Sequence, residues 1–172
     1  MSGDNVRNEY QKYMTAIGRI AAGSASLEEV VLFGMLSLTK GSDPHELHLK
    51  LMHESLNKNI DGLKKIAKQR LKGKQQDSII KLLDKAHQLR VTRNETIHGN
   101  WFVWADGETL EPVSIGFSRY SKNKKTKKLE WTPHLVPKLK DLEKLGVDLN
   151  DCKEKLSTAL KDAYEKLLFS GV

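Results

Sequence analysis

An apolar residue recurs every three or four positions over most of the chain, and this period constrains the fold more than any other feature. Near the C-terminus the phase continues across Gly146 without a break. A glycine inside a helix costs about 1 kcal/mol relative to alanine, but a phase kept on both sides of it predicts one long helix from about Lys138 onward. The apolar positions of this helix are Leu139, Leu142, Leu145, Leu149, Cys152, Leu156, Leu160, Ala163 and Leu167.

The same period predicts two helices near the N-terminus. The first covers about Asp4–Ala22 and ends at Gly23-Ser24. The second opens with a capping box, in which the side chains of Ser26 and Glu29 satisfy each other's backbone N–H groups, and it runs to Leu38. Because this helix is apolar on nearly every side, we expect it to be largely buried.

The middle of the chain predicts two further helices after an ambiguous segment. Residues 45–56 fit either a short helix or a loop, and Pro44 is well placed at a helix start. A third helix follows at about Leu56–Leu71, and a fourth at about Gln75–His98. We expect Gly99 to end the fourth helix in the left-handed conformation that favours glycine.

A β insert follows the fourth helix. Residues 101–104 and 113–117 alternate as strands do around a turn at 105–108, which predicts a β-hairpin. A lysine-rich turn at 121–128 and a short third strand at 129–131 complete the insert.

The insert ends before the last helix, because Pro133 and Pro137 exclude helix from this stretch. We therefore predict a mainly α fold, a bundle of four to five helices with a small β-hairpin insert between the last two. The expected organisation is a single domain over residues 1–172, with the insert at about 101–135.

The composition suits a compact cytoplasmic domain. Hydrophobic residues make up 38% of the chain, too many for a disordered protein. The single cysteine, Cys152, excludes a disulfide scaffold. The segment after Met1 is polar and does not resemble a signal peptide. The most apolar stretch, Val30–Leu38, is about half the length a membrane helix needs, so we expect no membrane association.

The charge favours an anionic partner. Lys and Arg number 29 against 22 Asp and Glu, a net charge of +7. Residues 58–93 alone hold eleven basic and three acidic residues, a net charge of +8. Such a segment fits a groove for an RNA backbone, and it equally fits a solvated lysine face on two amphipathic helices.

The end of the fourth helix carries the most chemistry. Asn94 and His98 lie four residues apart on one face, and Arg90 lies on the same stripe. Arg93 and His98 are five apart, about 140° around an ideal helix. These two converge only if the last turn distorts, if Arg93 reaches around, or if the site lies at an interface. A simple helix cap with a solvated surface is the alternative.

The run Arg93-Asn94-Glu95-Thr96-Ile97-His98-Gly99 resembles the signature of the HEPN superfamily of helical domains. In that motif four to six residues separate an arginine from a histidine near the end of the penultimate core helix, and a polar residue directly follows the arginine. Here four residues lie between Arg93 and His98, and the polar residue is Asn94. The expected helical architecture covers essentially the whole chain, apart from the β insert.

This resemblance implies a metal-independent endoribonuclease in which two copies of the motif line one cleft of a dimer. It implies that His98 acts as general acid or base, that Arg93 stabilises charge on the phosphate, and that Asn94 orients Arg93 or the phosphate. We assign Arg90 to substrate binding. It also implies a role as a toxin or phage-defence effector, RNA as substrate, and a nucleotidyltransferase-like antitoxin as partner. No metal or cofactor is expected.

Two other functional classes remain open, and several chemical alternatives are unfavourable. The chain fits a non-catalytic HEPN-like module that binds nucleic acid or protein, or a plain structural bundle. The run at His45–His48 resembles a zinc-protease motif but is one residue too short. Cys152 lies on a buried stripe, which predicts a core residue. We expect Trp101, Trp104 and Trp131 to pack the insert against the bundle.

Overall fold

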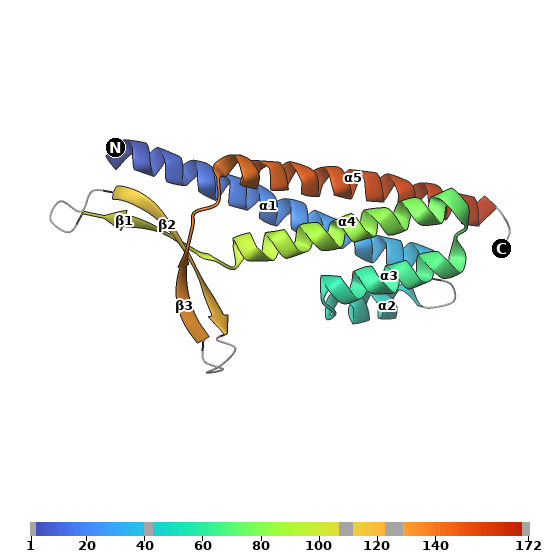
Figure 1. Cartoon of the computed structure of the whole chain (residues 1–172). Helices are drawn as coiled ribbons and strands as arrows, with labels where there is room; N and C mark the ends of the chain where they lie inside the picture. The colour runs from blue at the N-terminus through green and yellow to red at the C-terminus, as the bar shows by residue number, and fades with distance from the viewer. Residues whose placement is uncertain (1–2, 40–42, 107–111, 123–128, 170–172) are drawn as a thin grey trace. The chain divides into compact units, whose positions relative to one another are not determined.

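A computed structural model describes residues 3–39, 43–106, 112–122 and 129–169. Its helices are α1 (Gly3–Leu38), α2 (Pro44–Met52), α3 (Leu56–Arg70), α4 (Gly73–Ile97) and α5 (Leu139–Phe169). Three strands, β1 (Asn100–Ala105), β2 (Pro112–Lys122) and β3 (Leu129–His134), lie between α4 and α5 (Figure 1). The predicted mainly α fold with a β insert between the last two helices is confirmed.

The chain divides into two compact units. The first contains residues 1–21 and 92–146, and the second contains residues 22–91 and 147–172. Helices α1, α4 and α5 each contribute residues to both units. The single domain expected over residues 1–172 stays a prediction.

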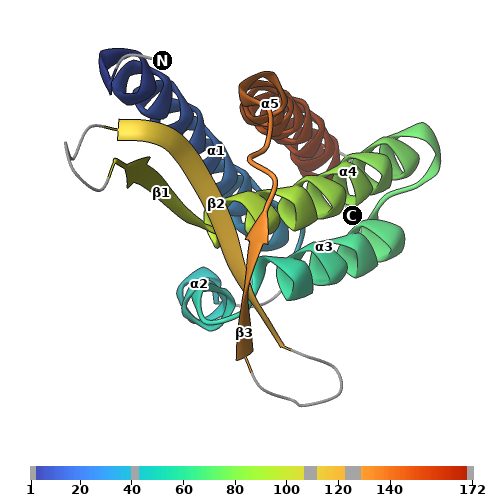
Figure 2. The ribbon, with the colours of Figure 1, turned by 60° about the vertical axis from the view of Figure 1, so that its left-hand side comes forward.

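The first unit contains the sheet, in which β2 lies between β1 and β3 and pairs antiparallel with both (Figure 2). Trp101 pairs with Phe117 in this register, and their ring centroids lie 4.6 Å apart. Trp101 also contacts Tyr13 of α1, at 5.4 Å between centroids. Aromatic side chains therefore join one face of the sheet to the N-terminal half of α1.

The second unit buries a helical core. Gly34 of α1 allows a close approach, since a Cβ there would lie 2.7 Å from Leu160 and 2.9 Å from Leu63. Cys152 is fully buried in this unit, as expected for a core residue. The largest fully buried side chains of the unit are Leu27, Val31, Leu38, Ile60, Leu63, Ile79, Leu83, Leu149, Cys152, Leu156 and Leu160.

The two helices expected near the N-terminus are one, and the break expected at Gly23-Ser24 is wrong. Ser24 is only 1% exposed and lies inside α1, four residues from the fully buried Ile20. Ser24 therefore continues the buried stripe of α1 instead of ending the helix. The predicted capping box at Ser26 is therefore interior helix. Phe33, expected to be buried, is 52% exposed.

Because α1 is unbroken, it is long enough to be considered as a membrane-spanning helix. Among the described helices it is the one long and apolar enough to cross a membrane, by length and composition alone. Its most apolar 18-residue window has a mean hydropathy of 1.3, and 33% of that window is buried. Core helices of soluble proteins meet the same criteria, so this finding is weak evidence for a membrane span.

Other boundaries follow the sequence more closely. Residues 45–56 include a short helix, α2, in which Pro44 occupies the first turn and the Asp43 side chain accepts a hydrogen bond from the His45 N–H at 2.8 Å. Gly146 lies inside a continuous α5, as predicted. The expected third strand is present as β3.

The turns of the insert need one correction. The sequence predicts a lysine-rich turn from residue 121, but Ser121 and Lys122 belong to β2 and pair with Glu130 and Leu129. The turn expected at 105–108 needs another, because Ala105 belongs to β1. Residues 107–108 and 123–128 lie outside the described part of the chain.

Candidate functional site

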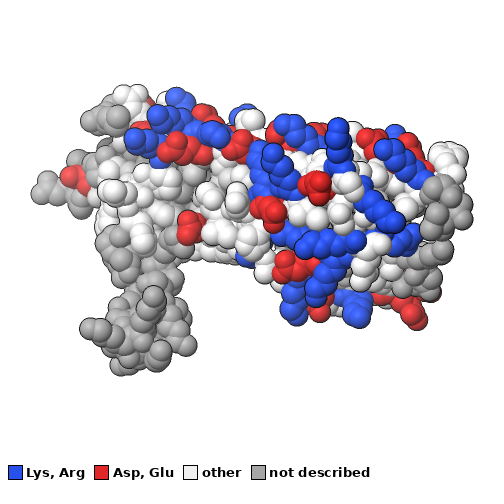
Figure 3. Space-filling model, turned by 45° about the vertical axis from the view of Figure 1, so that its right-hand side comes forward, with Lys and Arg blue, Asp and Glu red and all other residues white. Residues whose placement is uncertain are grey.

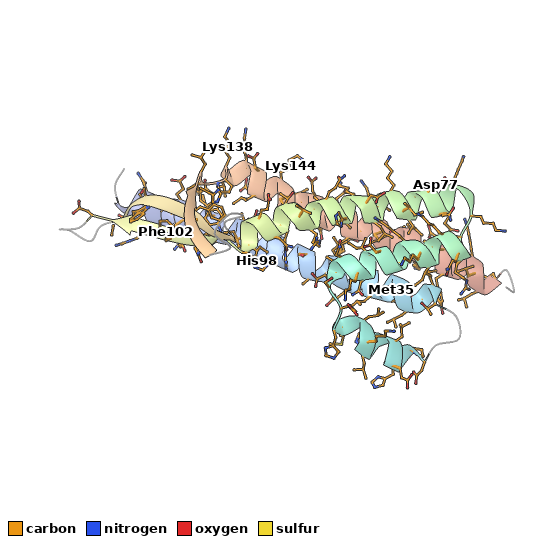
Figure 4. The ribbon with its side chains drawn as sticks, turned by 60° about the horizontal axis from the view of Figure 1, so that its bottom comes forward. Met35, Asp77, His98, Phe102, Lys138 and Lys144 are labelled. Atoms are coloured by element: carbon orange, nitrogen blue, oxygen red, sulfur yellow. The ribbon has the colours of Figure 1, made fainter. Side chains whose placement is uncertain are left out.

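The first unit holds the C-terminal end of α4, where the motif lies. Arg93 and Asn94 are half-buried there, and His98 is exposed just beyond the last residue of the helix. Figure 4 shows His98 where α4 leads into β1. The structure therefore gathers all three predicted catalytic residues at one helix end.

Asn94 contacts both of the other motif residues. Its Oδ1 accepts a hydrogen bond of 2.8 Å from Nη1 of Arg93. Its backbone carbonyl accepts the N–H of His98 at 3.2 Å, the hydrogen bond that closes the last turn of α4. Asn94 thus restricts the guanidinium and fixes the backbone of the histidine.

The Arg93 guanidinium retains an unused donor. Its Nε is buried and has no hydrogen-bond partner among the described residues. A buried donor without a partner carries a desolvation cost. Because this Nε is buried, an incoming phosphate reaches it only after the Arg93 side chain moves.

Arg93 and His98 do not bond to each other. Within the described part of the chain no hydrogen bond joins them, and the imidazole of His98 has no partner of its own. This is the outcome that their five-residue spacing predicts for one helix. The single chain therefore offers a restrained guanidinium and an uncommitted imidazole.

Trp101 fixes the segment that follows the motif, a role that the sequence did not reveal. Its Nε1 donates to the backbone carbonyl of Thr96 at 3.2 Å, and its ring packs between Tyr13 and Phe117. Thr96 is 6% exposed, and its hydroxyl donates to the Thr92 carbonyl. Carbonyls at a helix end lack intrahelical partners, so the indole satisfies one of them.

Gly99 does not adopt the expected left-handed conformation; among the described glycines only Gly73 has a positive φ, of 59°. The reason for glycine here is space. A Cβ at Gly99 would lie 1.9 Å from Cε2 of Phe117, whose ring rests against Trp101. The absence of a side chain at position 99 lets the sheet approach the end of α4.

The aromatic environment also acts on Tyr13. Burial raises the pKa of its phenol, the negative charge of Glu9 raises it further, and a backbone hydrogen bond with Leu139 opposes the two. Tyr13 therefore stays neutral and serves as packing.

The packing predicted for Trp101 is confirmed. Trp104 is 54% exposed, so the same prediction for it is wrong, and the Trp131 side chain lies outside the described residues.

Arg90, the expected substrate-binding residue, belongs to the second unit. It is half-buried on α4, and its Nε is buried without a partner among the described residues. Both arginines of α4 therefore have a buried Nε–H group without a hydrogen-bond partner among the described residues.

Other candidate chemistry finds no support. The Cys152 thiol contacts the Leu82 carbonyl at 3.6 Å, and burial raises its pKa, so it is not an activated nucleophile. Within the described ranges, no three His, Cys, Asp or Glu side chains gather as a metal site would require.

Comparison with known proteins gives no match. No family model, no curated protein and no solved structure is significantly similar to this chain.

Proposed function

We propose that this protein is a metal-independent endoribonuclease of the HEPN type that acts as a dimer. The observation that carries the proposal is the Asn94–Arg93 hydrogen bond, which restrains a guanidinium in the last turns of α4, the helix that leads into the exposed His98. A cytoplasmic role as a toxin or phage-defence effector follows from the resemblance of the motif.

The proposed reaction needs only proton transfer and charge stabilisation. A ribose 2′-oxygen attacks the adjacent phosphorus, forming the 2′-O–P bond while the P–O5′ bond breaks. His98 removes the 2′-hydroxyl proton or donates a proton to the leaving 5′-oxygen. Arg93 stabilises the negative charge on the phosphoryl oxygens, with Asn94 orienting it. The products are a 2′,3′-cyclic phosphate and a 5′-hydroxyl.

The spacing of Arg93 and His98 supports a site shared between two chains. Within one chain the two side chains have no mutual hydrogen bond among the described residues. A two-fold axis through the motif helices lets the arginine of one protomer meet the histidine of the other. The shared cleft then holds two Arg93–His98 pairs, each made of residues from both chains.

The remaining proposed partners follow from charge and from the resemblance. The half-buried Arg90 of α4 is the residue proposed to bind a substrate phosphate through its guanidinium. A nucleotidyltransferase-like antitoxin is the proposed inhibitor of a HEPN-type toxin. The proposed chemistry requires no cofactor.

The experiment that tests the proposal measures cleavage of a labelled RNA in excess EDTA. The wild-type chain is compared with Arg93→Ala and His98→Ala, each at matched concentration. Matched controls are Arg19→Ala and His45→Ala, which remove the same side-chain types from exposed positions of α1 and α2. We expect cleavage to persist with chelator, to be lost in both motif variants, and to survive in both controls.

The second candidate is a non-catalytic HEPN-like module that binds nucleic acid or protein. The observation that favours it is that Arg93 bonds Asn94 and not His98 within the described chain. RNA binding without cleavage, unchanged in His98→Ala, supports this module and contradicts the nuclease.

A further inference from the structure

In the second unit, α3 and the first part of α4 form an antiparallel helical hairpin. Lys64 of α3 pairs with Asp84 of α4 at 2.7 Å, and Gln76 Nε2 donates to the Lys68 carbonyl at 3.1 Å. The Gln76–Lys68 hydrogen bond lies near the closed end of the hairpin, where α3 leads into α4, and the Lys64–Asp84 pair joins the two helices further along. Side chains on the hairpin are therefore presented from a rigid base.

Five exposed lysines lie along this hairpin between residues 65 and 81, and we call them the hairpin lysines. None forms an ion pair with any described residue, whereas Lys58, Lys64 and Lys85 each pair with a carboxylate. Residues 65–83 contain one acidic residue, Asp77. Figure 3 shows Lys and Arg side chains, with Asp and Glu side chains among them, over the helical part of the molecule. The hairpin lysines are Lys65, Lys68, Lys72, Lys74 and Lys81.

The hairpin also lacks the apolar side chains that a membrane-binding surface uses. Peripheral helices insert exposed aromatic and aliphatic residues into the lipid interface. Within described residues 56–90 no large hydrophobic side chain is exposed. Positive charge without an apolar anchor favours a polyanion in water over an anionic membrane.

We propose that the hairpin lysines bind the phosphodiester backbone of RNA. Lys74 and Lys81 lie two helical turns apart, about 10 Å along α4, and Lys65 and Lys68 lie one turn apart on α3. Free ammonium groups at these intervals neutralise successive phosphates and release their counterions. This inference rests on the proposed function for the identity of the polyanion, and it assigns backbone binding to a surface other than the motif.

The test measures RNA binding in the His98→Ala background, so that cleavage does not consume the probe. A fluorescent single-stranded RNA is titrated with full-length protein over a series of salt concentrations. One variant changes all five hairpin lysines to glutamine. A control variant changes five other exposed or ion-paired lysines of the same unit to glutamine, and so removes the same charge: Lys50, Lys58, Lys153, Lys161 and Lys166.

We expect the hairpin variant to bind about tenfold or more weakly, and its salt slope to fall by about 0.7 for each phosphate that it no longer neutralises. The control variant is expected to retain most of the affinity. Replacing the hairpin lysines with arginine keeps the charge and is expected to preserve binding, which separates the effect of charge from misfolding. Equal decreases in affinity in the hairpin and control variants overturn the inference.

Two further results separate this inference from the proposed function. RNA binding through the hairpin lysines by a chain that never cleaves RNA supports the inference while the nuclease proposal fails. If the wild-type chain cleaves RNA but the variant with all five hairpin lysines changed to glutamine binds RNA unchanged, the nuclease proposal stands and this inference fails. Binding to phosphatidylserine vesicles that depends on the hairpin lysines, with none to RNA, identifies a membrane surface and also overturns the inference.

Discussion

At the scale of single residues, Gly99 shows how tightly the sheet meets the end of the motif helix. Alanine at this position places a Cβ 1.9 Å from Phe117, which is 5% exposed and packed on Trp101. The ring has no room to move, so we expect Gly99→Ala to lower the free energy of unfolding by about 1–3 kcal/mol. Urea unfolding followed by circular dichroism measures the change.

Gly18 provides the matched control. It lies inside α1, and a Cβ there meets nothing within 4 Å. We expect Gly18→Ala to raise the free energy of unfolding by about 0.5–1 kcal/mol, because alanine loses less backbone entropy in a helix. An equal gain from Gly99→Ala contradicts the close approach of Phe117.

Cys152 gives a prediction about pH. Burial raises the pKa of its thiol, so the folded protein keeps the proton where the unfolded chain releases it. Below the ordinary cysteine pKa of about 8.5 both states are protonated and this group costs no stability. As the pH rises past that value, ionisation favours the unfolded chain and the free energy of unfolding falls.

The measurement compares the wild-type chain with Cys152→Ala in urea unfolding between about pH 8 and pH 10. We expect the wild-type protein to lose more stability over this range than the variant does. Other groups that ionise there, such as Tyr13, are common to both proteins. If the free energy of unfolding changes with pH in the same way in both proteins, the thiol ionises as freely in the folded protein as in the unfolded chain, and the prediction is wrong.

At the scale of elements, α1 is one helix where the sequence predicts two, and Ser24 lies at the expected break. Ser24 is buried in this helix, and its hydroxyl has no partner among the described residues. Ser24→Ala removes an unsatisfied polar group and improves helix propensity, so we expect a gain of about 0.5–2 kcal/mol in unfolding free energy. Thermal and urea unfolding measure it.

Ser26→Ala distinguishes one helix from two. If Ser26 were the N-cap of a second helix, Ser26→Ala would lower the free energy of unfolding by about 0.5–2 kcal/mol. Because Ser26 is an interior residue of α1, we expect Ser26→Ala to leave the free energy of unfolding unchanged or to raise it by a few tenths of a kcal/mol. A loss in Ser26→Ala together with no gain in Ser24→Ala means that the helix breaks near Gly23-Ser24 after all.

Periodicity and proline placement are enough to predict most elements. The phase kept across Gly146 predicts a continuous α5, and Pro44 marks the start of α2. Local signals fail where burial decides the outcome. Gly23-Ser24 has the composition of a break, but small residues also suit a buried helix stripe, and sequence alone does not separate the two.

The candidate site divides in the same way. Helix geometry predicts the shared face of Asn94 and His98, and it also predicts the separation of Arg93 from His98. It does not predict the packing of Tyr13 on Trp101, because that contact joins segments far apart in the sequence. The sequence predicts a cap at Gly99, whereas the small size of this residue accommodates Phe117, a residue of β2.

At the scale of the whole molecule, the proposed nuclease makes a prediction that no single chain can satisfy. If each Arg93–His98 pair in the shared cleft takes Arg93 from one protomer and His98 from the other, a mixed dimer of Arg93→Ala and His98→Ala chains holds one pair with both residues intact. Its second pair lacks both residues. Either variant alone has no intact pair, so mixing is expected to restore cleavage.

Equal amounts of the two variants, unfolded together and refolded, are expected to recover about a quarter of the wild-type rate, since random pairing makes half of the dimers mixed and each of these has one of its two Arg93–His98 pairs intact. Rate is measured on labelled RNA in excess EDTA, with each refolded variant alone as the control. No recovery, in a mixture shown by mass spectrometry to contain mixed dimers, means that the residues do not act across the dimer. The distance between Arg93 and His98 on one helix would then have to be closed within a single chain, by a distorted last turn of α4.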